Sequence, residues 1–221
     1  MKSMNTLSVA PLFRLLAAGL SLLAVAACGT LRPAATPHAA FYALEGAQAA
    51  ASAAVPKQAP AAAPTLIVNP PHAAAGFDSS RIIYVRETHK LEYFAHSEWV
   101  DPPARMLAPL IVAAVENSGA FRAVALTPSA ATGELRLDTE IIRLQQEFRT
   151  QPSRARFTLR AYLIDDKTRR VLAWREFDAA VPAASDDPYG GVVAANQAVQ
   201  AVLKELAAFC ADATRDMRTG K

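Results

Sequence analysis

Hydrophobic and polar residues alternate with a period of two along much of the chain, the pattern of β-strands with one buried face. The alternation predicts seven strands, at 41–44, 65–68, 81–87, 91–94, 133–142, 154–164 and 171–177. A one-residue slip at Ile141–Ile142 predicts a β-bulge. In the strand at 154–164, the residues expected to face the core are Ala155, Phe157, Leu159, Ala161 and Leu163.

Two other segments repeat their apolar residues every three or four positions, which predicts helices at about 103–118 and 189–217. Asp101 and Pro102 are expected to cap and begin the first helix, and Pro109 to kink or delay it. The buried seam of the second helix is predicted to be Val192, Asn196, Val199, Leu203, Leu206, Cys210, Ala213 and Met217. Together, the elements predict a single two-layer α+β domain. Its mixed, mainly antiparallel sheet would carry both helices.

Residues 1–27 have the pattern of an export signal. Lys2 and Arg14 supply positive charge, and residues 15–27 carry no charge and end in small side chains. A membrane-spanning helix needs about twenty apolar residues, so this run is too short to span a bilayer. We therefore predict a signal peptide over 1–27, cleaved between Ala27 and Cys28.

Val25-Ala26-Ala27-Cys28 resembles the lipobox of bacterial lipoproteins. The resemblance implies that the Cys28 thiol receives a diacylglycerol and that the new amino terminus is acylated, with palmitate as a typical chain. Because Gly29 rather than aspartate follows the cysteine, the resemblance also implies the periplasmic face of a Gram-negative outer membrane. The alternative is that Cys28 simply ends the apolar run as a small residue.

The region between the export signal and the first long strands is rich in alanine and proline. We predict a lipidated tether over 28–40, followed by one domain over 41–221. Residues 47–64 are of low complexity, and their prolines break the helix that alanine favours. The sequence therefore predicts a disordered insertion there.

Composition narrows the function further. Without Lys2 and Arg14 the chain holds 21 basic and 20 acidic residues, a balance that argues against nucleic acid as a partner. The sequence has no HExxH, CxxC, GxSxG or Walker-type motif, and His89 and His96 match no metal-ligand template. We expect a protein that is not an enzyme and holds no metal or cofactor.

Nine basic and only three acidic residues lie between 143 and 175. Arg154, Arg156 and Arg160 alternate on the polar face of one predicted strand. They could form a solvated face that keeps the sheet from pairing with neighbours, or a docking surface for an acidic partner or anionic lipid headgroups. The aromatic stretch from Tyr93 to Trp99 is the other predicted contact surface.

Several segments together resemble the ABC-type transport auxiliary lipoprotein family, the PqiC-like proteins. They are the lipobox, "FYAL", "RIIYVRETHKLEYFAHSEWVDPPARML", "VENSGAFRAV", "ELRLDTEIIRLQQEF", "VLAWREF" and "AANQAV". The resemblance implies a non-enzymatic partner of an MCE-domain protein and its ABC transporter, which move lipids between the two membranes. Two alternatives stay open, namely a structural or assembly lipoprotein of the envelope and a module that carries lipid itself. The oligomeric state also stays open, a homo-oligomer included.

Overall fold

The computed structural model describes residues 38–45, 60 and 62–219. The chain divides into two compact units, Met1–His38 and Ala39–Lys221. The predicted signal peptide, Cys28, most of the tether and nearly all of the 47–64 insertion lie outside the described residues. The second unit is described below.

The described residues of the second unit form nine strands and two helices. In chain order they are β1 (Ala40–Tyr42), β2 (Thr65–Val68), β3 (His72–Ala73), β4 (Arg81–Val85), β5 (Glu92–Trp99), α3 (Pro103–Glu116), β6 (Ala123–Leu126), β7 (Leu135–Glu147), β8 (Arg154–Asp165), β9 (Val171–Pro182) and α4 (Pro188–Thr219).

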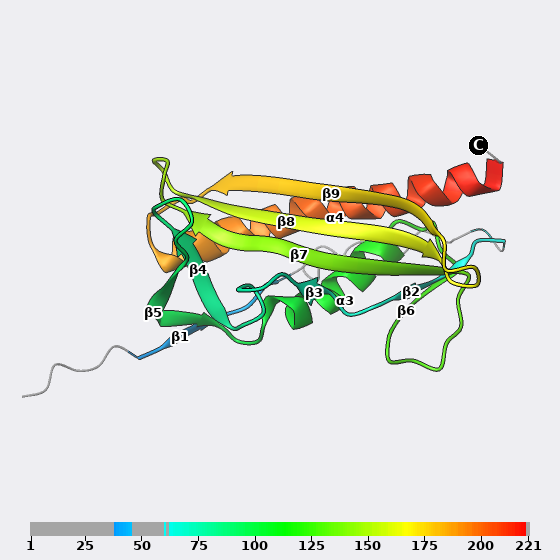
Figure 1. Ribbon diagram of the computed structural model, residues 1–221, viewed down its shortest axis with the longest axis horizontal. Helices are drawn as coiled ribbons and strands as arrows, with labels where there is room; N and C mark the ends of the chain where they lie inside the picture. Colours follow the sequence, from blue (N-terminus) through cyan, green and yellow to red (C-terminus); the bar gives the residue numbers. More distant parts are fainter. Residues whose placement is uncertain (1–37, 46–59, 61, 220–221) are drawn as a thin grey trace, which may run out of the picture. The chain divides into compact units, whose positions relative to one another are not determined.

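The long strand β7 organises one mixed sheet (Figure 1). Along one side it pairs antiparallel with β8, which pairs antiparallel with β9. Along its other side, the short strands β2, β3 and β4 pair with successive segments of β7 in parallel. The long pairings are antiparallel, and α3 and α4 pack on the sheet, so the predicted α+β fold is confirmed. No described helix covers the opposite face of β7, β8 and β9.

The strand predictions succeed where one face is buried. The register between β7 and β8 shifts between Ile141 and Arg143, which confirms the bulge. The five residues of β8 predicted to face the core are each at most 1% exposed. By contrast, β3 and β6 were not predicted. The two residues of β3 are too few to show a period, and β6, with the sequence AVAL, is apolar at every position and so shows no alternation.

The start of α3 corrects one prediction. The N-cap position is occupied by Pro102 and not by Asp101, and no side chain caps the helix. The Asp101 carboxylate instead accepts a hydrogen bond from Arg105, at 3.3 Å. Pro109 does not delay the helix, because it lies inside α3.

In α4, the cap and most of the seam agree with the sequence. Asp187 accepts a hydrogen bond from the Gly190 N–H at 2.7 Å, the bond of a helix N-cap. Met217, predicted to be buried, is 38% exposed. The buried face ends earlier, at Thr214, whose hydroxyl donates to the carbonyl oxygen of Cys210 at 2.7 Å.

The first turn of α4 passes so close to β7 that glycine is required at one position. A Cβ atom built on Gly191 would lie 2.0 Å from Oε1 of Gln146. Gln146 is 3% exposed, and its amide nitrogen donates to the Ser153 hydroxyl, at 2.9 Å. Gly191 thus lets α4 lie against the end of β7, the end that carries the most deeply buried charge.

Candidate functional site

The uncovered face of the three long strands carries rows of charged side chains. Antiparallel pairing aligns β7, β8 and β9 so that side chains of the same face stand beside one another. The β8 row is basic and the β9 row is acidic, with Arg154, Arg156 and Arg160 on β8 and Glu176 and Asp178 on β9. The β7 row is mixed, with Arg136 and Arg143 among Asp138, Glu140 and Glu147.

The middle of this face is held together by cross-strand ion pairs. Arg160 lies between Glu140, at 3.3 Å, and Glu176, at 2.9 Å. Arg156 donates to both carboxylate oxygens of Asp178, with the shortest distance 2.7 Å, the two-pronged geometry that guanidinium favours. The hydrogen bond from Arg156 lowers the pKa of Asp178, despite partial burial.

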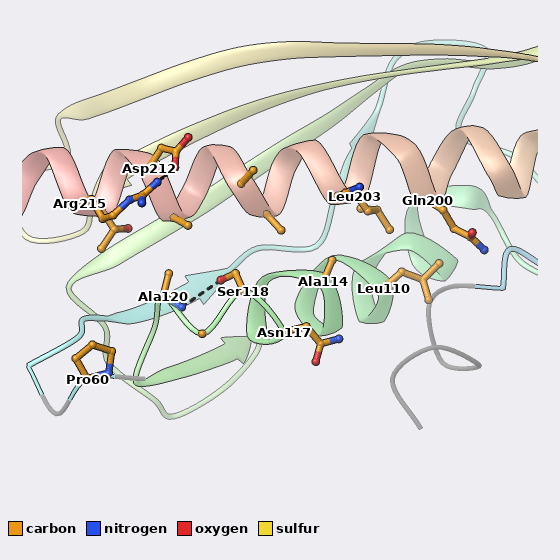
Figure 2. Close-up of a pocket in the computed structure, with 16 residues that line it drawn as sticks. Pro60, Leu110, Ala114, Asn117, Ser118, Ala120, Gln200, Leu203, Asp212 and Arg215 are labelled. Carbon is orange, nitrogen blue, oxygen red and sulfur yellow. Dashed lines mark hydrogen bonds and ion pairs between the residues drawn. The ribbon is translucent and has the colours of Figure 1, made fainter. Parts of the chain in front are cut away.

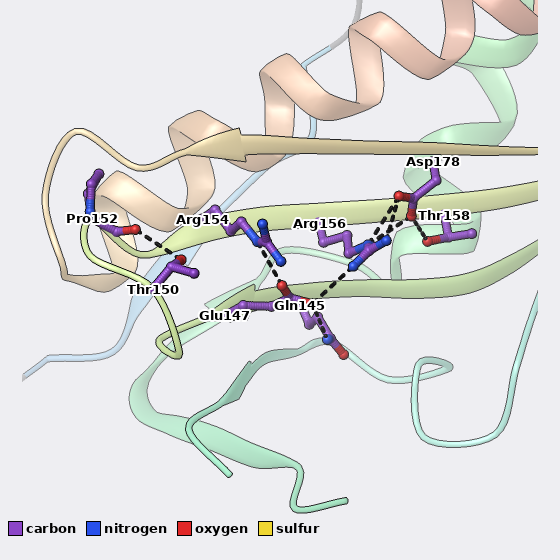
Figure 3. Close-up of polar contacts among 8 residues, drawn as sticks. All are labelled: Gln145, Glu147, Thr150, Pro152, Arg154, Arg156, Thr158 and Asp178. Carbon is purple, nitrogen blue, oxygen red and sulfur yellow. Dashed lines mark hydrogen bonds and ion pairs between the residues drawn. The ribbon is translucent and has the colours of Figure 1, made fainter. Parts of the chain in front are cut away.

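Glu147, at the end of β7, is the most buried charge on this face (Figure 3). Its carboxylate is 1% exposed and lies 2.9 Å from Nε of Arg154, with Arg156 farther away at 3.9 Å. The Gln145 amide also donates to it, at 3.1 Å. Burial alone would raise the pKa of Glu147, but these hydrogen bonds and the arginine charges outweigh burial, so its pKa lies below the usual value.

The three arginines singled out in the sequence are therefore brought together on one face, and each has an acidic partner. Counting charges between 143 and 175 missed Glu140, Glu176 and Asp178, because neighbouring strands contribute them from outside that window. Their role in partner binding stays a prediction. Their pairing shows that reversing all three charges would disturb the fold as well as the surface.

The aromatic stretch needs a correction. Trp99 is 3% exposed and belongs to the core, so its side chain is not part of the predicted contact surface. Tyr93 is 39% exposed, and the Arg81 guanidinium lies over its ring, with Cζ of Arg81 4.9 Å from the centre of the Tyr93 ring. The two residues do not form one contact surface.

An exposed aromatic pair on the uncovered face was missed. Trp174 on β9 is 62% exposed, and its ring stacks on Tyr162 of β8, with centres 6.4 Å apart. The sequence held only part of the signal, since Tyr162 lies on the predicted polar face. The pairing of Tyr162 with Trp174 is visible only in the folded sheet. A large exposed tryptophan is the residue type that most often dominates protein interfaces.

A second candidate site is an elongated groove of about 910 Å³ between α3 and α4 (Figure 2). Its apolar wall consists mainly of Leu110, Ala114, Leu203, Ala207, Ala208 and Ala211. Gln200 and Arg215, fifteen residues apart on α4, mark its extent, which at 1.5 Å per residue is about 22 Å. The volume lies within the range of small-molecule sites. The apolar wall suits a hydrocarbon chain, and the lining also includes polar side chains such as Asn117, Lys204 and Asp212.

Cys210 is a core residue, as its place on the predicted seam indicated. It is fully buried, and desolvation raises the pKa of its thiol to about 12. The reactive thiolate is therefore almost absent at pH 8. We expect native protein to leave Cys210 unlabelled by a thiol reagent over the time in which the urea-unfolded protein reacts fully. Equal labelling rates in the two states would show that α4 does not bury this seam.

In the described part of the chain, no group of three or more His, Cys, Asp or Glu side chains is placed to hold a metal ion. The same residues contain no helix that is long and apolar enough to cross a membrane.

Comparison with known proteins places the chain among transport lipoproteins. A family model described as "ABC-type transport auxiliary lipoprotein component" matches residues 42–207. No curated protein matches the chain.

Solved structures share this fold. A Xanthomonas campestris protein of family DUF330 is 26% identical, with a TM-score of 0.68, and the match covers 82% of this chain and 99% of that one. A hypothetical protein from Chlamydia trachomatis, 10% identical, shares the fold with a TM-score of 0.50, over 69% of this chain and 98% of its own.

Proposed function

Because the chain belongs to the ABC-type transport auxiliary lipoprotein family, we propose that it is a non-enzymatic component of an MCE-type system that moves lipids between the two membranes. The observation that carries the proposal is the family match over 42–207, which spans nearly all of the second unit. In this role the protein marks the outer-membrane end of the system and binds the MCE-domain protein from the periplasmic side.

The anchor in this proposal is Cys28. Lipidation there, with two or more acyl chains, would hold the protein on the membrane stably, since a single chain binds only marginally. Thirteen residue steps from Cys28 to Phe41 reach at most about 45 Å when extended, which leaves the domain room to meet a partner away from the bilayer.

Replacing Cys28 by serine tests the anchor and the partner together. In cells fed a fatty-acid probe, we expect wild-type protein to be labelled, to fractionate with outer membranes and to co-purify with the MCE-domain protein. The Cys28→Ser protein should be unlabelled and lost from the outer-membrane fraction.

Equal labelling of both proteins would contradict the lipoprotein assignment. Labelled wild-type protein that never co-purifies with the MCE-domain protein would instead favour a structural or assembly role in the envelope. The two results separate the anchor from the transport role.

A second candidate function, carrying lipid within the domain, is favoured by the groove between α3 and α4. Its extent of about 22 Å exceeds the roughly 15 Å that one leaflet of a bilayer's hydrocarbon core provides for an acyl chain. A fatty acid laid along α4 would have its hydrocarbon against Ala207, Ala208 and Ala211.

Filling the groove tests this second function. Ala208 is exposed in the groove, so Ala208→Trp should leave the fold intact and abolish binding of a fluorescent fatty acid. The matched control is Ala131→Trp, at an exposed loop position away from the groove, which should bind like wild type. Unchanged binding by Ala208→Trp, or no binding by wild type, would remove lipid carriage from the candidates.

A further inference from the structure

The strand β9 presents a long free edge. Within the described residues β9 pairs with β8 alone, so the backbone groups on its other side have no strand partner over Val171–Pro182. An edge of this length is a template for another strand unless charges, prolines or bulges block it. β9 has its only proline at the last position. Its register against β8 shifts near its start, between Val171 and Ala173, so that residues 173–182 run without a bulge.

The charges on the sheet indicate what kind of strand could pair with the β9 edge. On the uncovered face the β8 row is basic, and the β9 row, which forms the edge, is acidic, with Glu176 and Asp178 42% and 38% exposed. Opposite charges on neighbouring strands stabilise a sheet, and like charges destabilise it. A strand added beside the acidic row of β9 would therefore fit best if its own side chains on this face were basic.

The same pattern disfavours a second copy of this chain as the added strand. Two β9 strands paired antiparallel about their middle would bring Glu176 of one against Asp178 of the other. Among the other described strands, β1, β3 and β6 each pair on one side only. Their sequences are AFY, HA and AVAL, with no lysine or arginine. A different protein is therefore the better occupant.

Trp174 supplies a side-chain anchor beside this edge. On the uncovered face it precedes Glu176 and Asp178 at alternate positions, so an added strand would place one residue against the exposed indole and the next ones against the carboxylates. The chain enters the domain at β1, on the opposite edge of the sheet from β9, as the strand order shows (Figure 1). The β9 edge thus stays clear of the point where the chain enters.

We propose that the β9 edge binds an extended, basic segment of a partner protein by strand addition, with Trp174 holding an apolar residue of that segment. Backbone hydrogen bonds to β9 provide the affinity, and Trp174, Glu176 and Asp178 select the register. This proposal does not depend on which transport system the protein serves.

The test uses a dye-labelled synthetic peptide of the length of β9 whose alternate positions on one face read valine, lysine, lysine, so that the valine can meet Trp174 and the lysines Glu176 and Asp178. The control peptide has glutamate in place of each lysine. We expect the purified full chain to bind the lysine peptide and not the glutamate peptide. The chain has two tryptophans, and Trp99 is buried, so a blue shift of emission on binding reports Trp174. Hydrogen exchange should slow at amides of β9.

Trp174→Ala should weaken binding of the lysine peptide at least about tenfold, as expected for a tryptophan at the centre of an interface. The matched control is Tyr189→Ala, which removes another exposed aromatic, 64% exposed at the start of α4, and should bind like wild type. Equal binding of the two peptides, or undiminished binding by Trp174→Ala, overturns the proposal. No binding of the lysine peptide overturns it as well.

Discussion

Replacing Glu147 by alanine is expected to lower the free energy of unfolding by about 3 kcal/mol. Its carboxylate is 1% exposed and paired with Arg154 at 2.9 Å, and breaking a buried pair leaves the other charge without its partner. We place the loss at the lower end of the usual range because Arg154 is 36% exposed, so its guanidinium can turn to water. Urea unfolding at pH 7 measures the effect.

Glu140→Ala is the matched control on the same strand. Its carboxylate pairs with Arg160 at 3.3 Å but is 37% exposed, and exposed pairs contribute at most about 1 kcal/mol. We expect a loss below that value. Equal losses for the two variants would mean that Glu147 is solvated in solution.

The pH dependence of stability gives an independent measure of the same residue. The folded state lowers the pKa of Glu147, so its contribution to stability is present above the unfolded pKa, about 4.3, and is lost as the pH falls through the folded value. Wild type should therefore lose stability in acid, below about pH 5. Glu147→Gln should be less stable at pH 7 and should show a shallower decline. Parallel pH profiles would contradict this role.

β8 and α4 could be predicted because each buries one continuous face. β7 and β9 were predicted only in part, because the period of β7 breaks at its bulge and β9 buries only Phe177. In β8, every second residue from Ala155 to Leu163 is buried, and a period of two is then visible in the sequence. The bulge at Ile141 was visible for the same reason, as a break in that period. Short strands such as β3 have too few residues for any pattern to emerge.

Contacts between strands could not be predicted, since register is a property of the folded sheet. The sequence placed Arg156 on the polar face of its strand, but could not show that its side chain reaches Asp178, 22 positions away and opposite Thr158. The sequence count of basic residues between 143 and 175 was correct. It did not give the charge of the surface, because acidic residues outside that range pair with the arginines. The groove lay beyond prediction too, because it requires α3 and α4 to be side by side.

Local signals failed where packing overrode them. Asp101 before a proline is a good N-cap by propensity, but the N-cap is one residue later, at Pro102, although α3 begins at Pro103 as its apolar period predicts. Trp99 ends β5 in a stretch of aromatic and polar residues that resembles a surface, yet its indole is in the core. Neither outcome can be read from neighbouring residues alone.

Leu206→Ala is expected to lower the free energy of unfolding by about 2–5 kcal/mol, because the change removes a fully buried side chain and leaves a cavity. Leu206 lies on the face of α4 that packs against β8 and β9, in the same core as Phe177 and Phe209. The rings of those two residues meet edge to face with centres 5.8 Å apart, so the surroundings cannot easily collapse into the space.

Met217→Ala is the control that tests whether the loss of stability depends on burial of the side chain or only on its position along the predicted seam. Sequence periodicity places Met217 on the same seam as Leu206, but the side chain is 38% exposed. If burial sets the cost, Met217→Ala should lower stability by less than about 1 kcal/mol, a small part of what deletion of a buried side chain costs. Comparable losses at both positions, measured by urea unfolding of the purified protein, would show that the buried face continues past Thr214. A loss below about 1 kcal/mol for Leu206→Ala would show instead that α4 is not docked on the sheet.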